Sequence, residues 1–420
     1  MGKKIVLGLM TLVWVVLLGI FLFFLWNKGS GSSKNPEENE ESKKTIRVTA
    51  EETAHKEDET ESELSEEQKT EELIEEYLSN MPLEDKVSQL FFVQPEALTG
   101  VDTAVQASDM TKEALQEYAV GGIVMFSKNI QDRDQICAML ANLQAYSKYP
   151  LFLGVDEEGG SLVARVANSG TISVPTFPNM MEIGNTGNPE EAYEVGRTIG
   201  TYLKDLGFNL DFAPIADVLV NPENQVIGER AFGSDAELVA KMVKRVVEGL
   251  QEQEVSAVLK HFPGHGGTEA DSHEGTAILN RTLEELRSEE FLPFQSGIEA
   301  GADMIMVGHI SVPEVTGDDT PATLSETVIT DLLRNELGFD GIIITDSMSM
   351  GAIVDHYGPG EAAVQVIRAG GDMILMPQDF VEARQAVLDA VDQQEITEER
   401  INESVRRILA WKISLGLIAV

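Results

Sequence analysis

Gly341-Ile-Ile-Ile-Thr345, followed at once by Asp346, is the stretch from which the fold prediction starts. Three β-branched residues in a row between a glycine and a polar end are typical of a short parallel strand that is covered on both faces. Seven other short apolar runs occur along the chain, and most of them also lack polar alternation. Together the eight runs occupy residues 89–93, 122–126, 151–155, 209–213, 257–261, 304–308, 341–345 and 372–376.

Helical patterns lie between these runs, and two of them have clear start signals. Asn188-Pro-Glu-Glu offers a capping side chain followed by a first-turn proline, and Thr282-Leu-Glu-Glu fits a capping box. Eight strand–helix units within residues 70–420 predict an α/β fold, a single (β/α)8 TIM-type barrel. An open doubly wound sheet of the same length is the alternative.

The N-terminal segment is predicted to cross a membrane. Residues 5–26 are 22 consecutive uncharged and almost wholly apolar positions, enough for a helix to span about 30 Å of hydrocarbon. Lys3 and Lys4 precede the run, which favours a cytoplasmic N-terminus. We therefore expect residues 1–28 to be an uncleaved signal anchor, with a single pass through the cell membrane and an extracellular catalytic domain. Cleavage within residues 29–33 is the alternative.

Residues 29–69 are rich in Glu, Ser, Lys and Thr and contain hardly any large apolar residue. Such a segment buries too little apolar surface to offset the entropy of ordering, so we expect a disordered acidic linker. The catalytic domain is then predicted to occupy residues 70–420.

Composition excludes several classes of partner and site. The chain has 71 acidic and 31 basic residues and a formal net charge of −40, which repels nucleic acid phosphates. Its single cysteine, Cys137, excludes an intrachain disulfide and any cysteine-based zinc or iron–sulfur site. We expect no cofactor and a monomeric protein.

The active site of such a barrel lies at the carboxyl ends of the strands, and polar residues follow several of the apolar runs. Asp156 follows the third run, Lys260 and His261 end the fifth, and Asp346 follows the seventh. A carboxylate at the end of a buried strand is costly unless it is paired or used. Asp346 is therefore a candidate nucleophile for attack on an anomeric carbon.

The densest polar stretch is Lys260-His-Phe-Pro-Gly-His-Gly-Gly-Thr-Glu-Ala-Asp-Ser-His273. On an extended loop, Asp271 and His273 point to one face and can hydrogen-bond, which fixes the imidazole tautomer and leaves its other nitrogen free to exchange a proton. The imidazoles of His261, His265 and His273 could instead bind a metal. Their spacing matches no usual zinc pattern, so we expect no metal site.

These motifs resemble a known family. The Lys260–His273 stretch, Thr345-Asp-Ser-Met-Ser-Met, Asp156-Glu-Glu-Gly-Gly, Gly228-Glu-Arg-Ala-Phe-Gly and Gly121-Gly-Ile-Val-Met-Phe-Ser are similar to those of the bacterial β-N-acetylglucosaminidases of glycoside hydrolase family 3. The resemblance covers about residues 72 to 417.

The resemblance implies a retaining exo-β-N-acetylglucosaminidase that cleaves terminal N-acetylglucosamine from cell-wall fragments such as muropeptides. Asp346 would be the nucleophile, and His273, oriented by Asp271, the acid/base. By the same match, four residues would bind the sugar: Asp156, Arg230, Lys260 and His261. Two departures stand out. The family's Asp-Gln-Glu-Gly-Gly-Arg-Val reads Asp156-Glu-Glu-Gly-Gly-Ser-Leu here, which leaves the role of Arg165 open, and Gly267 replaces an aspartate.

Three alternative functions remain. A catalytically silent, anchored glycan-binding barrel would lack Asp346 or the Asp271–His273 pair, and all three residues are present. A metal-dependent hydrolase on a similar barrel would be inhibited by chelators. A phosphorylase is the third, because a histidine acid/base repels phosphate less than a glutamate would.

Overall fold

The computed structural model describes residues 65–268 and 277–420. The predicted transmembrane segment, nearly all of the predicted linker, and both Asp271 and His273 lie outside the described residues. In the described ranges, no helix is long and apolar enough to cross a bilayer. The first described helix, α2 (Glu66–Asn80), begins before the domain boundary expected at residue 70 because Ser65 and Gln68 cap each other's backbone N–H groups.

Eight parallel strands form the centre of the described domain, and each corresponds to one predicted apolar run. They are β1 (Phe91–Val93), β2 (Gly122–Met125), β3 (Phe152–Val155), β6 (Leu210–Asp211), β7 (Ser256–Phe262), β9 (Met304–Val307), β11 (Ile342–Thr345) and β12 (Ile374–Leu375). Their order in the sheet is β11-β9-β7-β6-β3-β2-β1-β12. The two ends of this sheet meet, because Ile344 and Met373 form a parallel bridge and the Thr345 N–H donates to the Met373 carbonyl at 3.1 Å.

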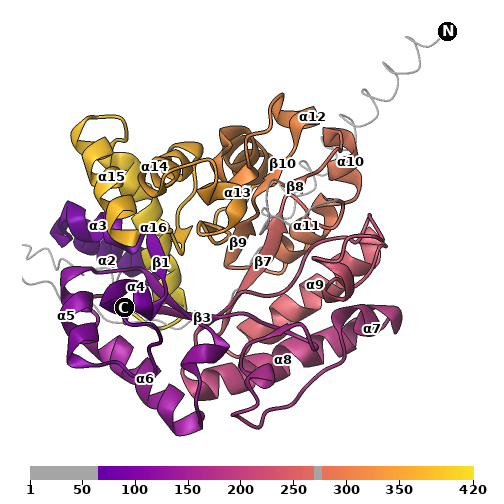
Figure 1. Cartoon of the computed structure of the whole chain (residues 1–420), viewed down its shortest axis with the longest axis horizontal. Helices are drawn as coiled ribbons and strands as arrows, with labels where there is room; N and C mark the ends of the chain where they lie inside the picture. Colours follow the sequence, from indigo (N-terminus) through magenta and orange to yellow (C-terminus); the bar gives the residue numbers. More distant parts are fainter. Residues whose placement is uncertain (1–64, 269–276) are drawn as a thin grey trace, which may run out of the picture. The chain divides into compact units, whose positions relative to one another are not determined.

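The ring of strands confirms the predicted TIM-type barrel and rules out the open sheet. Helices surround it (Figure 1). They are α3 (Leu83–Gln89), α4 (Pro95–Thr99), α5 (Asp109–Glu117), α6 (Arg133–Tyr146), α7 (Met180–Asn185), α8 (Pro189–Leu206), α9 (Ala236–Gln251), α10 (Leu283–Ser288), α11 (Phe291–Glu299), α12 (Pro313–Thr316), α13 (Gly351–Val354), α14 (Pro359–Ala369), α15 (Phe380–Asp392), α16 (Glu398–Ser414) and the π-helix η5 (Thr327–Glu336).

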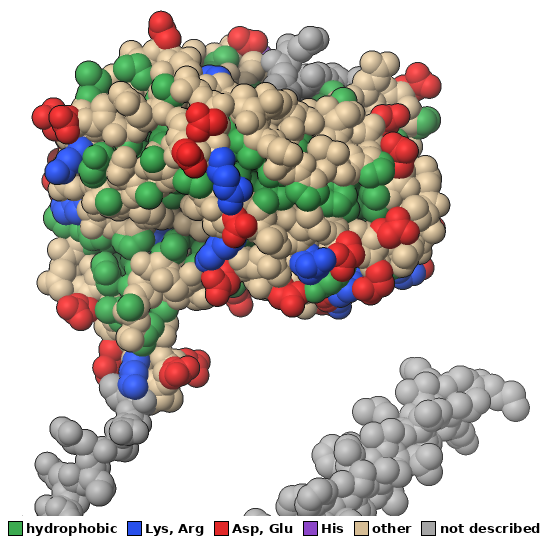
Figure 2. Space-filling view, turned by 90° about the horizontal axis from the view of Figure 1, so that it is seen from below, with side chains coloured by type: hydrophobic (Ala, Val, Ile, Leu, Met, Phe, Trp, Pro, Cys, Tyr) green, Lys and Arg blue, Asp and Glu red, His purple; other side chains and the backbone are tan. Residues whose placement is uncertain are grey.

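Several shorter elements lie outside the eight-stranded ring. They are the hairpin of β4 (Glu157–Gly159) and β5 (Val163–Ala164), the pair β8 (Ala277–Ile278) and β10 (Ile310–Ser311), and the 3-10 turns η1 (Ser127–Asn129), η2 (Ala167–Ser169), η3 (Gly228–Arg230) and η4 (Ala322–Leu324). The two predicted caps are confirmed, since Asn188 caps α8 and Thr282 forms a capping box at the start of α10. Figure 2 shows Asp and Glu side chains dispersed over one face, without a broad basic patch among the described residues of that face.

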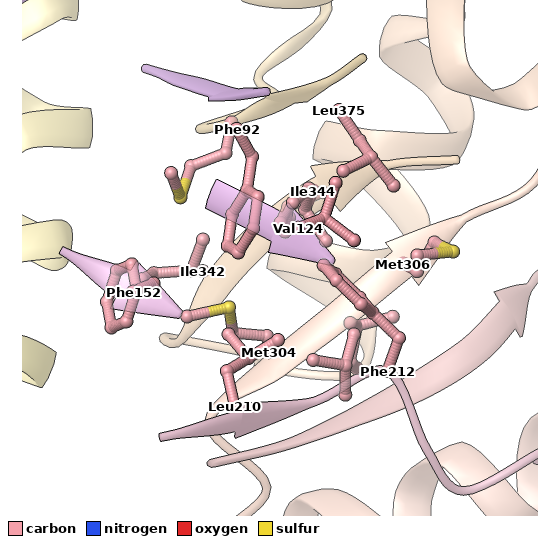
Figure 3. Packing of buried hydrophobic residues seen from close by; sticks show 14 of the residues in the cluster. Phe92, Val124, Phe152, Leu210, Phe212, Met304, Met306, Ile342, Ile344 and Leu375 are labelled. Atoms are coloured by element: carbon pink, nitrogen blue, oxygen red, sulfur yellow. The ribbon is translucent and has the colours of Figure 1, made fainter. Parts of the chain in front are cut away.

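Large side chains from facing strands fill the barrel interior (Figure 3). The rings of Phe92 and Phe212 meet edge to face with their centroids 5.2 Å apart, and both are almost completely buried. Room for Phe92 comes from glycines on β2 and β3. A Cβ at Gly122 would lie 2.5 Å from the Phe92 ring, and one at Gly154 would lie 2.9 Å from it. The barrel therefore needs glycine at these two strand positions.

Gly122→Ala is expected to lower the free energy of unfolding by about 1–3 kcal/mol, because overpacking forces the Phe92 ring or the strand to move. Thermal unfolding followed by circular dichroism measures the effect. Gly358→Ala is the control, since a Cβ there meets nothing within 4 Å. Equal melting temperatures for Gly122→Ala and the wild type would contradict this account of the interior.

One lysine of the core is buried against a side-chain amide and an aromatic ring. Lys412 of α16 is fully buried, its Nζ donates to Gln89 Oε1 at 2.7 Å, and it lies 5.1 Å from the centroid of the Phe152 ring. Burial without a carboxylate partner among the described residues lowers the pKa of Lys412 to about 7. An unfolded chain keeps this pKa near 10.4.

The free energy of unfolding should therefore rise with pH because of the titration of Lys412. Below about pH 7 the folded protein carries the full cost of a buried ammonium, and that cost disappears between about pH 7 and 10.4 as the folded state releases its proton first. Lys412→Met is expected to stabilise the protein, relative to wild type, by up to about 4 kcal/mol more at pH 6 than at pH 10. Melting temperatures across this range test it. The exposed Lys241→Met is the control, and a pH-independent difference for Lys412→Met would refute the explanation.

Candidate active site

A cavity of about 420 Å³ opens at the carboxyl ends of the barrel strands. All strand pairs in the ring are parallel, so the residues that follow different strands meet at one end of the barrel. The polar residues that line the cavity are Asp156, Glu158, Arg165, Arg230, Lys260, His261, His265, Asp346, Ser347 and Ser349. A larger groove of about 670 Å³, between α14 and α15, is lined by none of them.

Asp346 follows β11 directly and is held by the backbone on both sides. Its N–H donates to the Val307 carbonyl at 2.8 Å, and its Oδ1 accepts the Ser347 N–H at 2.7 Å. Burial alone would raise the pKa of Asp346, but the nearby histidines His261 and His309, with the Ser347 N–H, outweigh burial and lower it. The carboxylate is therefore kept ionised inside the cavity, as a nucleophile requires.

Four of the predicted sugar-binding residues meet in this cavity, and three of them belong to one ion-pair network. Lys260 Nζ lies 2.7 Å from Asp156 Oδ1 and 2.6 Å from Glu158 Oε1. Arg230 grips Glu158 with two hydrogen bonds, from Nε at 2.8 Å and from Nη2 at 2.7 Å. Each buried charge in the network thus has an opposite charge within hydrogen-bond distance, which is what makes its burial tolerable.

Glu158 is the centre of this network, and it is not among the site residues expected from the sequence. The signal was present, because side chains alternate in an extended chain and Glu158 lies two residues after Asp156. Burial alone would raise the pKa of Glu158, but the charges and hydrogen bonds of Arg230 and Lys260 lower it to about 2. Glu158 thus holds both cations in fixed positions around the cavity.

His261, the fourth predicted sugar-binding residue, is oriented by a buried carboxylate. Its Nδ1 lies 2.8 Å from Asp217 Oδ2, and the His261 N–H also donates to Asp217. Asp217 Oδ1 accepts the His265 N–H at 2.6 Å as well. These donors and the charge of His261 outweigh burial and lower the pKa of Asp217. The ionised Asp217 accepts from Nδ1 of His261 and so fixes Nδ1 as a donor. Nε2 is then the ring nitrogen that remains for other contacts.

His265 fastens the loop that follows β7. Its Nδ1 lies 2.8 Å from Thr268 Oγ1, and its carbonyl accepts the Asn224 side-chain amide at 2.8 Å. The same amide also donates to the Thr268 carbonyl at 3.1 Å. Burial lowers the pKa of His265. His265 both braces the loop and lines the cavity, and Thr268 is anchored immediately before the segment that contains Asp271 and His273, both of which lie outside the described residues.

His309 supports the peptide that follows Asp346. It is fully buried, its Nε2 lies 2.8 Å from the Ser347 carbonyl, and its Nδ1 lies 2.9 Å from Thr323 Oγ1. Because a carbonyl oxygen only accepts, Nε2 carries a proton. His309 thereby holds the peptide next to Asp346. Asp303 lies elsewhere, at the amino end of β9, where burial raises its pKa to about 6.

Comparisons with known proteins identify the family of this chain. Residues 82–411 match the glycosyl hydrolase family 3 N terminal domain. β-Hexosaminidase LpqI of Mycobacterium tuberculosis is 34% identical over 341 residues, which are 78% of this chain and 82% of that protein. A solved family 3 β-N-acetylglucosaminidase from a Paenibacillus species is 39% identical, has a TM-score of 0.75, and is covered over 64% of its length by 81% of this chain. The chain belongs to glycosyl hydrolase family 3.

Relatives differ in length. β-Hexosaminidase A of Pseudoalteromonas piscicida is 33% identical over 332 residues, and the match covers 72% of this chain but 55% of that protein. The chain thus spans about half the length of some curated relatives and most of the length of others. The family assignment applies to the barrel, which contains every described residue of the cavity.

Two departures from the usual motifs of the family have structural counterparts. Glu157, where the family has glutamine, accepts the Tyr202 hydroxyl at 2.7 Å and the Val166 N–H at 2.7 Å. Ser161, where the family has arginine, donates its N–H to Asn179 Oδ1 at 2.8 Å. Both residues fasten the β4–β5 hairpin at the rim of the cavity.

Asp211, at the end of β6, is a buried carboxylate that accepts a hydrogen bond from the backbone. Asp211 Oδ1 accepts the Glu157 N–H at 2.9 Å, and burial raises its pKa. Within residues 65–268 and 277–420, no group of three or more His, Cys, Asp or Glu side chains could hold a metal ion.

Glu158→Gln is expected to lower the free energy of unfolding by about 3 kcal/mol at pH 7, because Lys260 and Arg230 then lose a buried counter-charge. The direction in which this stabilisation changes with pH follows from the lowered pKa of Glu158. The wild-type contribution is complete above about pH 4.3 and is lost as the pH falls towards the folded-state pKa of about 2.

Chemical denaturation at pH 7, 4 and 3 measures this, and the deficit of Glu158→Gln should shrink at the two lower values. Glu237→Gln, on a carboxylate whose side chain is 82% exposed, is the matched control. A deficit that stayed constant down to pH 3 would show that the network does not depend on the charge of Glu158.

Proposed function

We propose that the protein is a retaining exo-β-N-acetylglucosaminidase that releases terminal β-linked N-acetylglucosamine from cell-wall glycan fragments, including muropeptides. One observation carries the proposal. The ionised Asp346 lines the same cavity as the residues expected to hold the sugar, which are Asp156, Arg230, Lys260 and His261. The names of the relatives support the sugar specificity.

The first half of the reaction forms a covalent intermediate. A carboxylate oxygen of Asp346 attacks the anomeric carbon as the bond from that carbon to the leaving oxygen breaks. His273, oriented by Asp271, gives its proton to the leaving oxygen. A histidine acid serves the role that a second carboxylic acid serves in most glycosidases.

The second half restores the enzyme. His273 takes a proton from water, the water oxygen bonds to the anomeric carbon, and the Asp346 carboxylate leaves. Two inversions at one carbon retain the β configuration. The lowered pKa of Asp346 suits both steps, since a stable carboxylate is a good leaving group.

Lys260, Arg230 and Asp156 hold the sugar. Asp156 and the edge of the guanidinium of Arg230 line the cavity, so they can accept from and donate to sugar hydroxyls while their partners keep them in place. Fixed donors and acceptors of this kind cost little reorganisation in the transition state. The Nε2 of His261 is available to the same sugar.

We also propose that residues 1–28 hold the enzyme in the cell membrane and that residues 29–69 space the catalytic domain, as a monomer, away from its outer surface. The uncharged run over residues 5–26 and the acidic composition after it support this. Extraction of the full chain from cell membranes with detergent but not with salt would support the anchor, and its recovery in the soluble fraction would refute it.

Asp346→Asn is expected to lower kcat for a chromogenic β-N-acetylglucosaminide at least about a thousandfold, because the amide cannot form the glycosyl-enzyme. The exposed Asp355→Asn is the control. His273→Ala should lose less activity on substrates with activated leaving groups, which need little protonation. Unchanged hydrolysis by Asp346→Asn would end the proposal.

The alternative functions give different products. A phosphorylase would release N-acetylglucosamine 1-phosphate when phosphate is present, whereas a hydrolase releases the free sugar with or without it. A metal-dependent hydrolase would be inhibited by chelators, and a silent glycan-binding barrel would bind the sugar without turnover. β-Glucoside turnover equal to that of the N-acetylglucosaminide would refute the proposed sugar specificity.

A further inference from the structure

The chain segments on the two sides of residues 269–276 contact each other. Gly267 lies shortly before these residues and Leu279 shortly after them, and a Cβ at Gly267 would lie 2.6 Å from Leu279 Cδ1. The same Cβ would lie 3.8 Å from Glu290 Oε1. The proposed acid/base and its aspartate partner belong to the residues between these two segments. The position of Glu290 therefore bears on both ends of the stretch that contains them.

Glu290 is almost completely buried, with 1% of its surface exposed, and it packs against the loop that follows β7. A Cβ at Gly264 would lie 2.7 Å from Glu290 Cγ and 2.9 Å from Glu290 Cβ. The φ of Gly264 is +131°, an angle that residues with a side chain rarely adopt. Glycine is thus needed at position 264 for its backbone angle and because Glu290 occupies the neighbouring space. The backbone of the loop lies directly on this side chain.

Arg281 supplies the counter-charge of Glu290. Its Nε lies 3.2 Å from Glu290 Oε1, and its Nη2 donates to Glu290 Oε2 at 3.4 Å. Burial raises the pKa of Glu290, and the charge of Arg281 opposes this shift. Arg281 also donates its N–H to the Leu279 carbonyl at 3.0 Å. The ion pair thus joins the segment that follows residues 269–276 to the side chain that supports the segment before them.

Helix α11 gives Glu290 a fixed base. Glu290 immediately precedes Phe291, the first residue of α11. The rings of Phe291 and Phe262 stack with their centroids 5.2 Å apart, and Phe294 meets the Phe262 ring edge to face, also at 5.2 Å. Phe262 is the last residue of β7, the strand that carries two of the predicted sugar-binding residues. Aromatic packing therefore holds Glu290 in a defined position relative to the barrel.

Neither Arg281 nor Glu290 lines the active-site cavity, so neither is placed to contact the substrate. A buried ion pair adds little to stability, because the cost of removing both charges from water offsets most of their attraction. It does fix the geometry of the groups around it. The loop after β7 also has no carboxylate of its own here, since Gly267 replaces an aspartate. Glu290 is the carboxylate that lies beside that position.

We infer that Glu290, held by Arg281, is a positioning residue that fixes both ends of the stretch containing the proposed acid/base, His273. This inference rests on the proposed function and adds two residues to it. Proton transfer requires the donor to be within hydrogen-bond reach of the leaving oxygen. Loss of the ion pair shifts the ends of the stretch, so it reduces protonation of the leaving group without changing the groups that bind the sugar.

The test uses aryl β-N-acetylglucosaminides whose leaving groups range from dinitrophenol, which leaves without protonation, to phenol, which needs it. The measured quantity is kcat/KM, because it reports the first half of the reaction, in which the acid acts. Glu290→Gln keeps the shape of the side chain and removes its charge. We expect this variant to lower kcat/KM about ten- to hundredfold for the phenyl glycoside and less than about threefold for the dinitrophenyl glycoside.

Glu289→Gln is the matched control. Glu289 is the adjacent residue and also pairs with Arg281, but its side chain is 46% exposed, and it is not the carboxylate beside Gly264 and Gly267. This variant should match the wild type for every leaving group. Arg281→Lys should retain more activity on the phenyl glycoside than Arg281→Met, because the ammonium keeps the charge. Melting temperatures establish that each variant is folded.

Combining Glu290→Gln with His273→Ala separates positioning from a general structural effect. If Glu290 acts through His273, the double variant should have the same kcat/KM as His273→Ala alone for each leaving group. A further loss in the double variant, equal for all leaving groups, would show that Glu290 supports the fold and that the inference is wrong.

The remaining outcomes are distinct. If Glu290→Gln lowers kcat/KM equally for all leaving groups, or not at all, the inference is wrong and the proposed function stands. If Glu290→Gln does not fold, the difference between Arg281→Lys and Arg281→Met decides the inference in the same way. If the wild type hydrolyses none of the glycosides, or if the loss in His273→Ala does not depend on the leaving group, the proposed function fails and the inference fails with it.

Discussion

Closure of the strand ring is the constraint on which the rest of this molecule depends. The bridge between Ile344 and Met373 joins β11 to the start of β12 and converts a row of parallel strands into a barrel. Parallel strands in a closed ring deliver their carboxyl ends to one place. Asp156, Lys260 and Asp346 are far apart in the sequence and line one cavity for that reason.

The side chains inside the barrel have to fit within the same ring of strands. Phe92 and Phe212 fill its centre, and the glycines of β2 and β3 leave space for them (Figure 3). The carboxyl end can then hold polar groups, because apolar packing below them excludes water and fixes the strands. In this setting each charge of the cavity depends on its neighbours. Glu158 remains a carboxylate at full burial only because Lys260 and Arg230 adjoin it.

Charge pairing also differs between parts of the cavity. On one side Asp217 orients His261, and Glu158 fixes Arg230 and Lys260, which holds these donors and acceptors in place. On the other side Arg165 lies 5.7 Å from the centroid of the Phe126 ring. Asp346 lies in the same cavity, where His309 holds the peptide that follows it.

The sequence by itself determined the barrel and four of the residues that line the cavity. Eight apolar runs, read with the parallel-strand pattern, matched the eight strands, and polar residues after those runs gave Asp156, Lys260, His261 and Asp346. These predictions succeeded because the apolar pattern of a buried strand and the polar residues at its end can be recognised from neighbouring positions in the sequence. α2 begins at Glu66, before the domain boundary expected at residue 70, because Ser65 and Gln68 form a capping box there.

Tertiary structure alone decided the pairings. Glu158 is the hub of the network, Asp217 supports His261, and Arg165 has no counter-charge among the described residues. Each depends on which side chains from distant strands lie within about 3 Å. Sequence spacing carries no such distances. Charge pairing and burial depend on the closed ring of strands. They are therefore established only in the folded barrel, in which β11 and β12 are adjacent.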